Sequence, residues 1–320
     1  MDLLPPRLHL LTAVLGLLVF SLSAPSMGME KSKGPAVDKM EPPHWWNGGT
    51  EREFVLVLYG PKLSDCTVST EEPRLTVLAN ERREHEDFLF VRMRVEPGCT
   101  EGIKSLMLTD AKDRATPLSF PIHDARLRPV GGQGIESGST LYLIMPDRFA
   151  NGDPSNDTVE GLREQGVDRS EMYARHGGDL QGIAQHVDYL DALGVDALWL
   201  NPVLLNDQPK ASYHGYAVTD HYQVDPRLGG NAAYRDMVAG CHEKDIRVIQ
   251  DVIFNHWGHN HWMVRELPDS SWLHQWPEFT LTNYNCNVMT DPNAVPEEVA
   301  QFNKGSVSYT HLTLPTSNDV

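Results

Sequence analysis

Basic side chains are scarce in this 320-residue chain. Its 27 lysines and arginines stand against 44 aspartates and glutamates, which gives a formal net charge of −17. Because nucleic-acid binding depends on clustered basic residues that contact phosphates, this deficit argues against DNA or RNA as a partner. It also disfavours an anionic membrane surface and leaves a neutral or cationic substrate open. Disorder along the whole chain is excluded, because 40% of the residues are hydrophobic.

Cysteines are also few. The four are Cys66, Cys99, Cys241 and Cys286, and no two of them form a Cys-x-x-Cys pair. That spacing is typical of zinc and thiol redox sites, so neither kind of site is expected. Cys66 and Cys99 share one strand-rich region and either form a disulfide or remain two free thiols, because sequence does not determine connectivity.

The apolar run near the N-terminus is too short to span a bilayer comfortably. It covers the 13 residues 8–20, follows Arg7, and is succeeded by small residues up to Gly28. A charged, then apolar, then small segment is typical of a secretory signal peptide. Residues 1–28 are therefore expected to direct export to the periplasm or the cell exterior, with no membrane association after cleavage. An uncleaved membrane anchor is the alternative.

Short hydrophobic runs separated by turn residues dominate residues 35–125. The runs lie at residues 54–59, 75–79, 88–95 and 118–122. Arg92 and Arg94 alternate with apolar neighbours, which indicates a strand with one solvent-facing side. Several short strands at this spacing predict an immunoglobulin-like β-sandwich domain. The glycine-rich segment 126–138 is interpreted as a linker.

From residue 139 onward the pattern changes to alternating strands and helices. Apolar runs at 140–145, 195–200 and 246–252 predict parallel strands that are covered on both faces. Residues 180–190 repeat apolar side chains at helical spacing, and Gly194 is a suitable helix stop. Asn231 is expected to cap a second helix, with Tyr234, Met237, Val238 and Cys241 on its inner face. This alternation indicates a parallel α/β domain, either a barrel or a doubly wound sheet.

Polar and aromatic residues follow each of the three expected strands. Asp147 follows the first strand, a Tyr-His-Gly-Tyr segment at 213–216 comes after the second, and His256 comes after the third. Active groups of parallel α/β folds collect at the carboxyl ends of the strands. Side chains of these types can stack on a sugar and hydrogen-bond to it, so a sugar site is predicted at this edge.

Five motifs, taken in this order, resemble the α-amylase family of glycoside hydrolases, family 13. They are YLIMPDRFANGD at 142–153, GGDLQGI at 177–183, HGY at 214–216, VDPRLGG at 224–230 and DVIFNH at 251–256. Within the family the neopullulanase and cyclomaltodextrinase branch is the most similar, and EPPHWW at 41–46 looks like the start of its N-terminal domain. The resemblance implies a (β/α)8 TIM barrel, truncated after about three strands, behind an immunoglobulin-like β-sandwich.

The resemblance also implies roles for individual residues. Tyr216 would place its ring under the sugar at the cleavage subsite, since the apolar face of a pyranose suits an aromatic platform. His256, and with less support His214, would hydrogen-bond the substrate there. Asp251 and Asn255 would have structural roles in the active site. The alternatives are a packing tyrosine and histidines that are only structural.

A calcium site is implied in the same way. Hard oxygen ligands crowded on a short loop suit Ca²⁺, which takes six to eight of them. The branch places such a site on residues that correspond to Asn151, Asp153, Asn156, Asp157, Gly177 and Asp179. The alternative is a solvated turn rich in Asn and Asp.

Residues 139–305 are expected to supply only part of the catalytic barrel, including the start of its inserted domain B, because a complete barrel takes about 250 residues. The nucleophile Asp, the acid/base Glu and a third Asp of the family lie on later strands. A retaining glycosidase needs two carboxyl groups about 5–5.5 Å apart. No catalytic residue is therefore assigned, and the chain is expected to be inactive alone. Residues 306–320 are interpreted as an artefactual tail.

The function implied by the resemblance is retaining hydrolysis of α-1,4-glucans such as pullulan, cyclomaltodextrins and maltooligosaccharides. Two alternatives remain open: a protein that binds α-glucan without chemistry, and a fragment without function. Relatives often dimerise through the N-terminal domain, so the resemblance also implies a possible homodimer.

Overall fold

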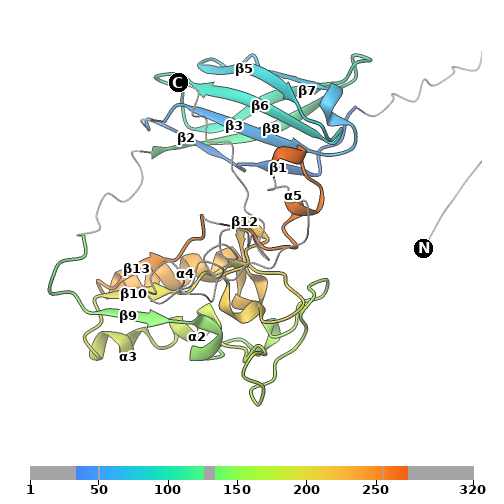
Figure 1. Ribbon diagram of the computed structural model, residues 1–320. Helices are drawn as coiled ribbons and strands as arrows, with labels where there is room; N and C mark the ends of the chain where they lie inside the picture. Colours follow the sequence, from blue (N-terminus) through green and yellow to red (C-terminus); the bar gives the residue numbers. More distant parts are fainter. Residues whose placement is uncertain (1–33, 50, 126–133, 255, 273–320) are drawn as a thin grey trace, which may run out of the picture. The chain divides into compact units, whose positions relative to one another are not determined.

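The computed structural model describes residues 34–49, 51–125, 134–254 and 256–272 (Figure 1). The signal peptide expected at 1–28, the tail at 306–320 and Asn255 lie outside these residues, as does part of the linker expected at 126–138. Within the described ranges, no helix combines the length and the hydrophobicity that a membrane crossing requires.

Residues 39–124 form two four-stranded sheets. One sheet has the order β1-β3-β6-β5 and is antiparallel throughout, and the other has the order β2-β8-β7-β4, in which only β2 and β8 are parallel. The strands are β1 Lys39–Glu41, β2 Trp45–Asn47, β3 Glu53–Tyr59, β4 Thr67–Ser69, β5 Leu75–Arg82, β6 Phe88–Val95, β7 Gly102–Thr109 and β8 Ala115–Asp124. Both sheets contribute to one hydrophobic core, so the predicted sandwich architecture is confirmed.

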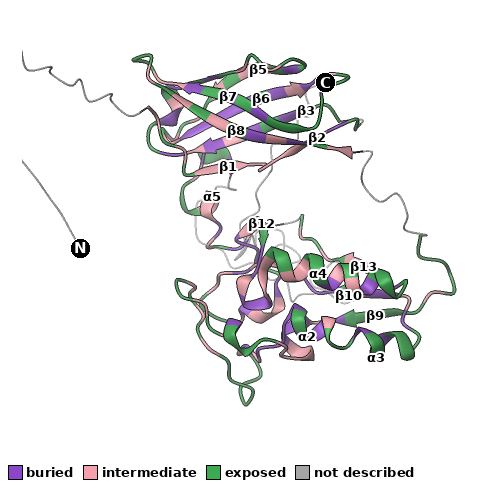
Figure 2. Ribbon diagram, turned by 180° about the vertical axis from the view of Figure 1, so that it is seen from behind, coloured by how far each residue is buried: buried purple, intermediate pink, exposed green. Residues whose placement is uncertain are grey.

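The core of the sandwich is built from inward-facing residues of both sheets (Figure 2). Leu56 and Val91 of the first sheet and Leu106 and Phe120 of the second are fully buried. Each side chain of this kind stabilises the fold by about 1.5–3 kcal/mol relative to exposure.

The buried cysteines are free thiols. Cys66 and Cys99 lie within the sandwich core, and the structure shows no disulfide between them. Burial raises the pKa of both thiols. Burial also raises the pKa of Cys241, in the second domain, to about 11. Of the two states that the sequence left open for Cys66 and Cys99, the free state is therefore the one found.

Strand β7 was not predicted, because its polarity pattern opposes its register. Lys104 is on the buried side and only 7% exposed, and its ammonium lies 3.0 Å from Thr100 Oγ1. Ile103, its neighbour, is 71% exposed. Hydrophobic alternation therefore suggests the wrong face for these positions, although the pairing with β8 is regular along the strand.

The second part of the chain contains a three-stranded parallel sheet with the order β13-β10-β9. Its elements, with a short antiparallel pair β11 and β12, are β9 Leu141–Ile144, α1 Pro146–Phe149, α2 Leu180–Ala184, α3 Val187–Ala192, β10 Ala197–Leu200, β11 Leu204–Leu205, β12 Asp220–Val224, α4 Gly230–Glu243, β13 Arg247–Gln250 and α5 Trp262–Arg265. All three predicted strands are present and parallel, so the predicted α/β pattern is confirmed.

Helices α2, α3 and α4 share one hydrophobic core with β9 and β10. Leu198 and Leu200 of β10 are fully buried in it. Trp199, which lies between them, and its partner Leu143 on β9 point to the other face of the sheet. Trp199 is 43% exposed and Leu143 is 60% exposed. The expectation that both faces of these strands are covered is therefore wrong for the described residues.

The helices differ from the prediction in two places. The helical pattern at 180–190 is divided into α2 and α3, while Gly194 follows α3 with a φ of +81°, as a helix stop should. The residue that precedes α4 is Gly229, with a φ of +103°. Asn231 lies inside the helix, and its Oδ1 accepts the N–H of Val224 at 2.7 Å. The prediction that Asn231 caps α4 is therefore wrong, because its side chain holds the end of β12 instead.

A buried ion pair stabilises the turn between β12 and α4. Arg227 and Asp225 are almost fully buried, and the guanidinium meets the carboxylate through Nε–Oδ1 at 2.9 Å and Nη2–Oδ2 at 2.7 Å. Arg227 also donates to the backbone oxygens of Glu164 at 3.2 Å and Asn206 at 3.0 Å. Burial raises the pKa of the Asp225 carboxyl, but the hydrogen bonds and charge of Arg227 outweigh it and hold that pKa below its usual value.

His261 is a second buried polar side chain, only 1% exposed. Its Nδ1 accepts the N–H of Met263 at 3.2 Å and so caps α5. Its proton therefore sits on Nε2, which lies 3.3 Å from Nδ1 of His221. The ring stacks on Trp257 with the centroids 3.9 Å apart. Burial, helped by His221, lowers the pKa of His261 to about 2.

The ion pair yields a stability prediction. Arg227→Met should lower the free energy of unfolding by about 3–5 kcal/mol, because it leaves the Asp225 carboxylate buried without its partner. Urea denaturation at pH 7 measures the change. Lys244→Met is the control, since it removes an exposed pair with Asp188 and should change stability little. Equal losses in the two variants would contradict the importance of the buried pair.

His261 yields a prediction about pH. Below about pH 6.5 the unfolded chain takes up a proton on this imidazole and the folded chain does not. The free energy of unfolding should therefore fall between pH 7 and pH 5, by at most about 1.4 kcal/mol per pH unit from this residue. His261→Asn keeps a capping oxygen and should make the fall smaller. Urea denaturation at both pH values tests it.

His259→Asn, at an exposed histidine of the same loop, is the matched control for that measurement. It should retain the wild-type difference in stability between pH 7 and pH 5. The explanation fails if His261→Asn retains the full difference as well.

Candidate functional site

The three parallel strands end at a common edge, which is where the sequence analysis predicted the polar and aromatic groups of a sugar site. Ile144, Leu200 and Gln250 are opposite one another in the register of the sheet. Asn201 N donates to the Ile144 oxygen at 2.9 Å, and Asp251 N donates to the Leu200 oxygen at 3.3 Å. The residues that directly follow the strands are therefore held in line by backbone hydrogen bonds.

Two sequence motifs, those at 214–216 and 251–256, meet at Tyr216 on this edge. Its hydroxyl donates to Asp251 Oδ2 at 2.9 Å, and its backbone N–H donates to His214 Nδ1, also at 2.9 Å. Its backbone oxygen lies 3.0 Å from Nε2 of His256. The structure thus brings together all four predicted residues that it describes at this site. Asn255, the fifth, lies outside the described residues.

The ring of Tyr216 is available to a ligand. It is 39% exposed, although burial and then the hydrogen bond to Asp251 raise the pKa of its hydroxyl. His214 is more enclosed, and burial lowers its pKa despite the opposing charge of Glu164. Because His214 Nδ1 accepts from the backbone, its proton is on Nε2. Tyr216 and His214 together offer a ligand one aromatic face and one imidazole N–H.

Glycine is required in the turn that presents Tyr216. Gly215 has a φ of +79°, and a Cβ there would lie 2.0 Å from the backbone oxygen of Pro202. Gly258 approaches the Ala217 oxygen just as closely, with 2.3 Å for its Cβ. The backbone on both sides of Tyr216 is therefore packed against its neighbours, and a side chain at either glycine would displace it.

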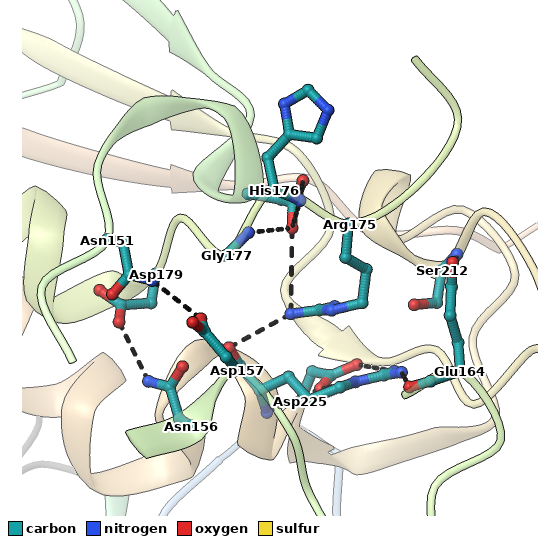
Figure 3. Close-up of polar contacts among 12 residues, drawn as sticks. Asn151, Asn156, Asp157, Glu164, Arg175, His176, Gly177, Asp179, Ser212 and Asp225 are labelled. Atoms are coloured by element: carbon teal, nitrogen blue, oxygen red, sulfur yellow. Dashed lines mark hydrogen bonds and ion pairs between the residues drawn. The ribbon is translucent and has the colours of Figure 1, made fainter. Parts of the chain in front are cut away.

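A second group of polar residues lies in the loops around α1 and before α2 (Figure 3). Its centre is Asp179, whose buried carboxylate accepts four hydrogen bonds. The donors are Gly152 N at 3.0 Å, Gly182 N at 2.6 Å, Asp153 N at 2.9 Å and Asn156 Nδ2 at 3.0 Å. Asp179 therefore caps α2 and holds two stretches of chain together.

Two side-chain oxygens in this group have no hydrogen-bond donor in the described structure. Asn151 Oδ1 and Asn156 Oδ1 are buried and unpaired within the described structure. Asp157 Oδ1 lies 2.8 Å from Asn151 Nδ2. A Cβ at Gly177 would come within 2.5 Å of that Asp157 oxygen, so the backbone there lies close to the carboxylate. We call Asn151, Asp153, Asn156, Asp157, Gly177 and Asp179 the oxygen cluster.

Asp153 is the most peripheral member of the oxygen cluster. It is exposed, and its carboxylate accepts from Ser155 N at 3.0 Å and Ser155 Oγ at 2.6 Å, which caps the short 3₁₀ helix Pro154–Asn156. These hydrogen bonds lower the pKa of the Asp153 carboxyl. Only its backbone N–H contacts Asp179, so its side chain contributes to the oxygen cluster less directly than those of Asn151 and Asp157.

Three charged residues link the oxygen cluster to the turn of Tyr216. The sequence analysis placed Asp147 at the sugar edge, where its carboxylate is instead buried, and assigned neither Arg148 nor Glu164. Asp147 is fully buried and accepts from the backbone N–H groups of His176 and Gly177 at 2.9 and 3.2 Å. Arg148 pairs with Asp147 at 2.5 Å and lies 4.0 Å from the centre of the Tyr213 ring. Glu164 accepts the N–H of Ser212 at 2.7 Å. Asp147 and Arg148 stand inside a motif, whereas nothing in the local sequence singles out Glu164.

Family comparison places both parts of the chain. The family described as "Alpha amylase, catalytic domain" matches residues 143–308, which is more than half of the chain. The family described as "Cyclomaltodextrinase, N-terminal" matches residues 39–126, the part that folds as the sandwich.

Individual proteins are similar to parts of the chain. The periplasmic α-amylase of Escherichia coli is 33% identical over 176 residues, covering 52% of this chain and 23% of that protein. The cyclomaltodextrinase of Thermoanaerobacter pseudethanolicus is 39% identical over 131 residues, covering 41% and 22%. The α-amylase structure from Anoxybacillus aligns with a TM-score of 0.43 and 32% identity, covering 54% of this chain and 34% of that one.

The chain spans 13% to 23% of the length of the curated relatives that it matches. The family motifs at 142–153 and 251–256 nonetheless lie at the carboxyl ends of β9 and β13. The three parallel strands are part of a TIM barrel, and the sandwich is the N-terminal domain that precedes it. The chain belongs to the α-amylase family of glycoside hydrolases.

Proposed function

We propose that the protein carrying this chain hydrolyses α-1,4-glucans, among them cyclomaltodextrins, pullulan and maltooligosaccharides, with retention at the anomeric carbon. The observation that carries the proposal is the convergence of Asp251, His214 and His256 on Tyr216, whose ring is partly exposed at the strand ends. Relatives named cyclomaltodextrinase and neopullulanase support the substrate class.

The chemistry of the site suits a neutral sugar. The apolar face of a pyranose stacks on a tyrosine ring, and the proposed role of Asp251 is to hold that ring through its hydroxyl. A neutral imidazole at His214 can donate its Nε2 proton to a sugar hydroxyl without attracting anions. The net charge of −17 does not oppose binding of an uncharged ligand. Retention would require two carboxyl groups of the whole protein about 5–5.5 Å apart.

We also propose that the oxygen cluster binds Ca²⁺. Two unpaired buried amide oxygens, the Asp157 carboxylate and the close approach of Gly177 are the donor types that this hard cation takes. Bound Ca²⁺ would supply positive charge that joins the 151–157 loop to Gly177. Asp179 would act chiefly as a scaffold, since four donors already occupy its carboxylate.

The calcium proposal predicts a thermal shift. A tenfold excess of Ca²⁺ over its dissociation constant should raise the melting temperature by about 3–6 °C, because a ligand that binds only the folded state adds RT ln(1 + [L]/Kd). Asp157→Asn should remove most of this shift, and Asp153→Ala should remove a smaller part of it. Differential scanning fluorimetry with CaCl2, against MgCl2 and chelator, measures it.

Asp168→Ala is the matched control for Asp153→Ala. The Asp168 carboxylate accepts from Ser170 N at 2.9 Å and from Ser170 Oγ at 2.6 Å. This is the arrangement of Asp153 and Ser155, but it lies outside the oxygen cluster. It should retain the full calcium shift. A full shift in Asp157→Asn, or an equal loss in Asp168→Ala, would reject this site.

The hydrolase proposal predicts the effect of changing the platform. In the whole protein, Tyr216→Ala should lower kcat/KM on maltooligosaccharides by about tenfold to a hundredfold, equivalent to about 1.4–2.7 kcal/mol. Tyr216→Phe keeps the ring and should lose less than tenfold. Release of reducing sugar measures both, and Tyr222→Ala, at another partly exposed tyrosine, is the control. Unchanged kcat/KM in Tyr216→Ala would contradict the platform.

The same assay applied to the 320-residue chain alone should show no hydrolysis, because the family's catalytic Asp, Glu and Asp are assigned to none of its residues. Binding of maltooligosaccharide without hydrolysis by the whole protein would instead support the glucan-binding alternative. Export through the segment at 1–28 and a homodimer through the sandwich remain predictions.

A further inference from the structure

The turn that presents Tyr216 has no capping side chain of its own. The 3₁₀ helix Ser212–His214 is preceded by Ala211, which has a φ of +55° and offers no side-chain hydrogen bond. Alanine in this left-handed region is strained, so neighbouring groups must hold it there. Glu164 does so from 48 residues away, through the hydrogen bond from Ser212 N to its Oε2 at 2.7 Å.

Glu164 is itself held on both sides. Its backbone oxygen accepts from the buried guanidinium of Arg227 at 3.2 Å. The adjacent Arg163 donates its backbone N–H to Asp207 Oδ1 at 2.7 Å and pairs with the same carboxylate at 3.4 Å. The loop around Glu164 is therefore fixed against the segment that leads into the Tyr216 turn, and not only by the one contact with Ser212.

This loop begins and ends in the oxygen cluster. Asp157 stands at its start and Gly177 at its end, and a Cβ on Gly177 would lie 2.5 Å from the Asp157 carboxylate. Figure 3 shows Glu164 near Ser212 on one side of the view and the cluster residues on the other. Closing the loop ends with a cation would restrict the residues between them, including Glu164.

A second contact joins the same two regions. The guanidinium of Arg148 stacks on Tyr213, and it donates to the backbone oxygens of Met172 at 2.8 Å and Ala174 at 2.9 Å, near the end of the loop. Tyr213 precedes His214, whose Nδ1 accepts the backbone N–H of Tyr216. The loop thus touches the turn at its first residue through Glu164 and at its second through Arg148.

We propose that Glu164 is a positioning residue, which sets the place of the Tyr216 ring through Ser212 and transmits cation binding at the oxygen cluster to it. The inference rests on the proposed roles of Tyr216 and of the cluster. It predicts that Ca²⁺ changes the surroundings of the Tyr216 ring even though no cluster residue hydrogen-bonds to that ring in the described structure.

The test uses the full chain labelled with 3-fluorotyrosine and observed by ¹⁹F NMR. Tyr216→Phe assigns the Tyr216 resonance among those of the ten tyrosines, because it removes one signal. Addition of CaCl2 should shift that resonance in the wild type by more than its line width. In Glu164→Ala the resonance should start from a different position, and its response to CaCl2 should be lost while the calcium-induced thermal shift remains.

Two further variants separate positioning from general damage to the loop. Glu164→Gln keeps an oxygen that accepts from Ser212 N and should restore the wild-type position and response. Gln165→Ala removes the neighbouring side chain, whose amide donates to the backbone oxygens of Val159 and Leu162 in its own loop, and should behave as the wild type. A Tyr216 resonance that is identical in the wild type and Glu164→Ala would overturn the inference, and so would equal changes in Glu164→Ala and Gln165→Ala.

The two proposals fail in different ways. If CaCl2 raises the melting temperature but leaves the Tyr216 resonance unmoved, the coupling is wrong and the calcium site stands. If CaCl2 has no thermal effect, the calcium site is wrong. The positioning role is then still decided by the calcium-free resonance in Glu164→Ala against Glu164→Gln.

Discussion

The buried pair of Arg227 and Asp225 is the interaction on which the arrangement of the site depends. Its two charges are removed from water, and six hydrogen bonds, four to the Asp225 carboxylate and two to backbone oxygens, satisfy them within the fold. Through the backbone oxygens of Glu164 and Asn206 the guanidinium joins the loop of the oxygen cluster to the segment after β10. The turn of Tyr216 contacts both segments, because Ser212 N donates to Glu164 Oε2 and Ser212 O accepts from Asn206 Nδ2. The position of this turn therefore depends on the pair.

Several motif residues act on the backbone: they allow two segments to approach closely or bind backbone N–H groups. Gly215 is needed because a Cβ would collide with the Pro202 oxygen, and Gly177 because it lies against Asp157. The Asp179 carboxylate accepts four N–H donors and so fixes the position of the 151–157 loop that carries the other oxygens of the cluster. Among the four described residues proposed to form the sugar site, Tyr216 combines a 39% exposed side chain with hydrogen bonds to both motifs.

Sequence reasoning reached the strands and the strand ends because their signals are local. A short apolar run such as residues 195–200 indicates a buried strand without reference to the rest of the chain. The motif residues that follow such strands share an edge, because parallel strands end on the same side of the sheet. The errors arose where one specific contact overrode the local pattern. Lys104 is buried against its pattern, Asn231 bonds to β12 and does not cap α4, and Glu164 acts on a residue 48 positions away. No local period records a partner at that separation.

The cost of burying Arg227 and Asp225 bears on why they are there. An apolar pair of the same volume would often be as stable, because desolvation of two charges offsets much of their attraction. Apolar side chains, however, could not bind the backbone oxygens of Glu164 and Asn206, which lie on separate loops. A guanidinium with five donors in a fixed plane can hold a carboxylate and two carbonyl groups at once. The pair is therefore better explained by the geometry that it imposes on the loops around Tyr216 than by the stability that it adds.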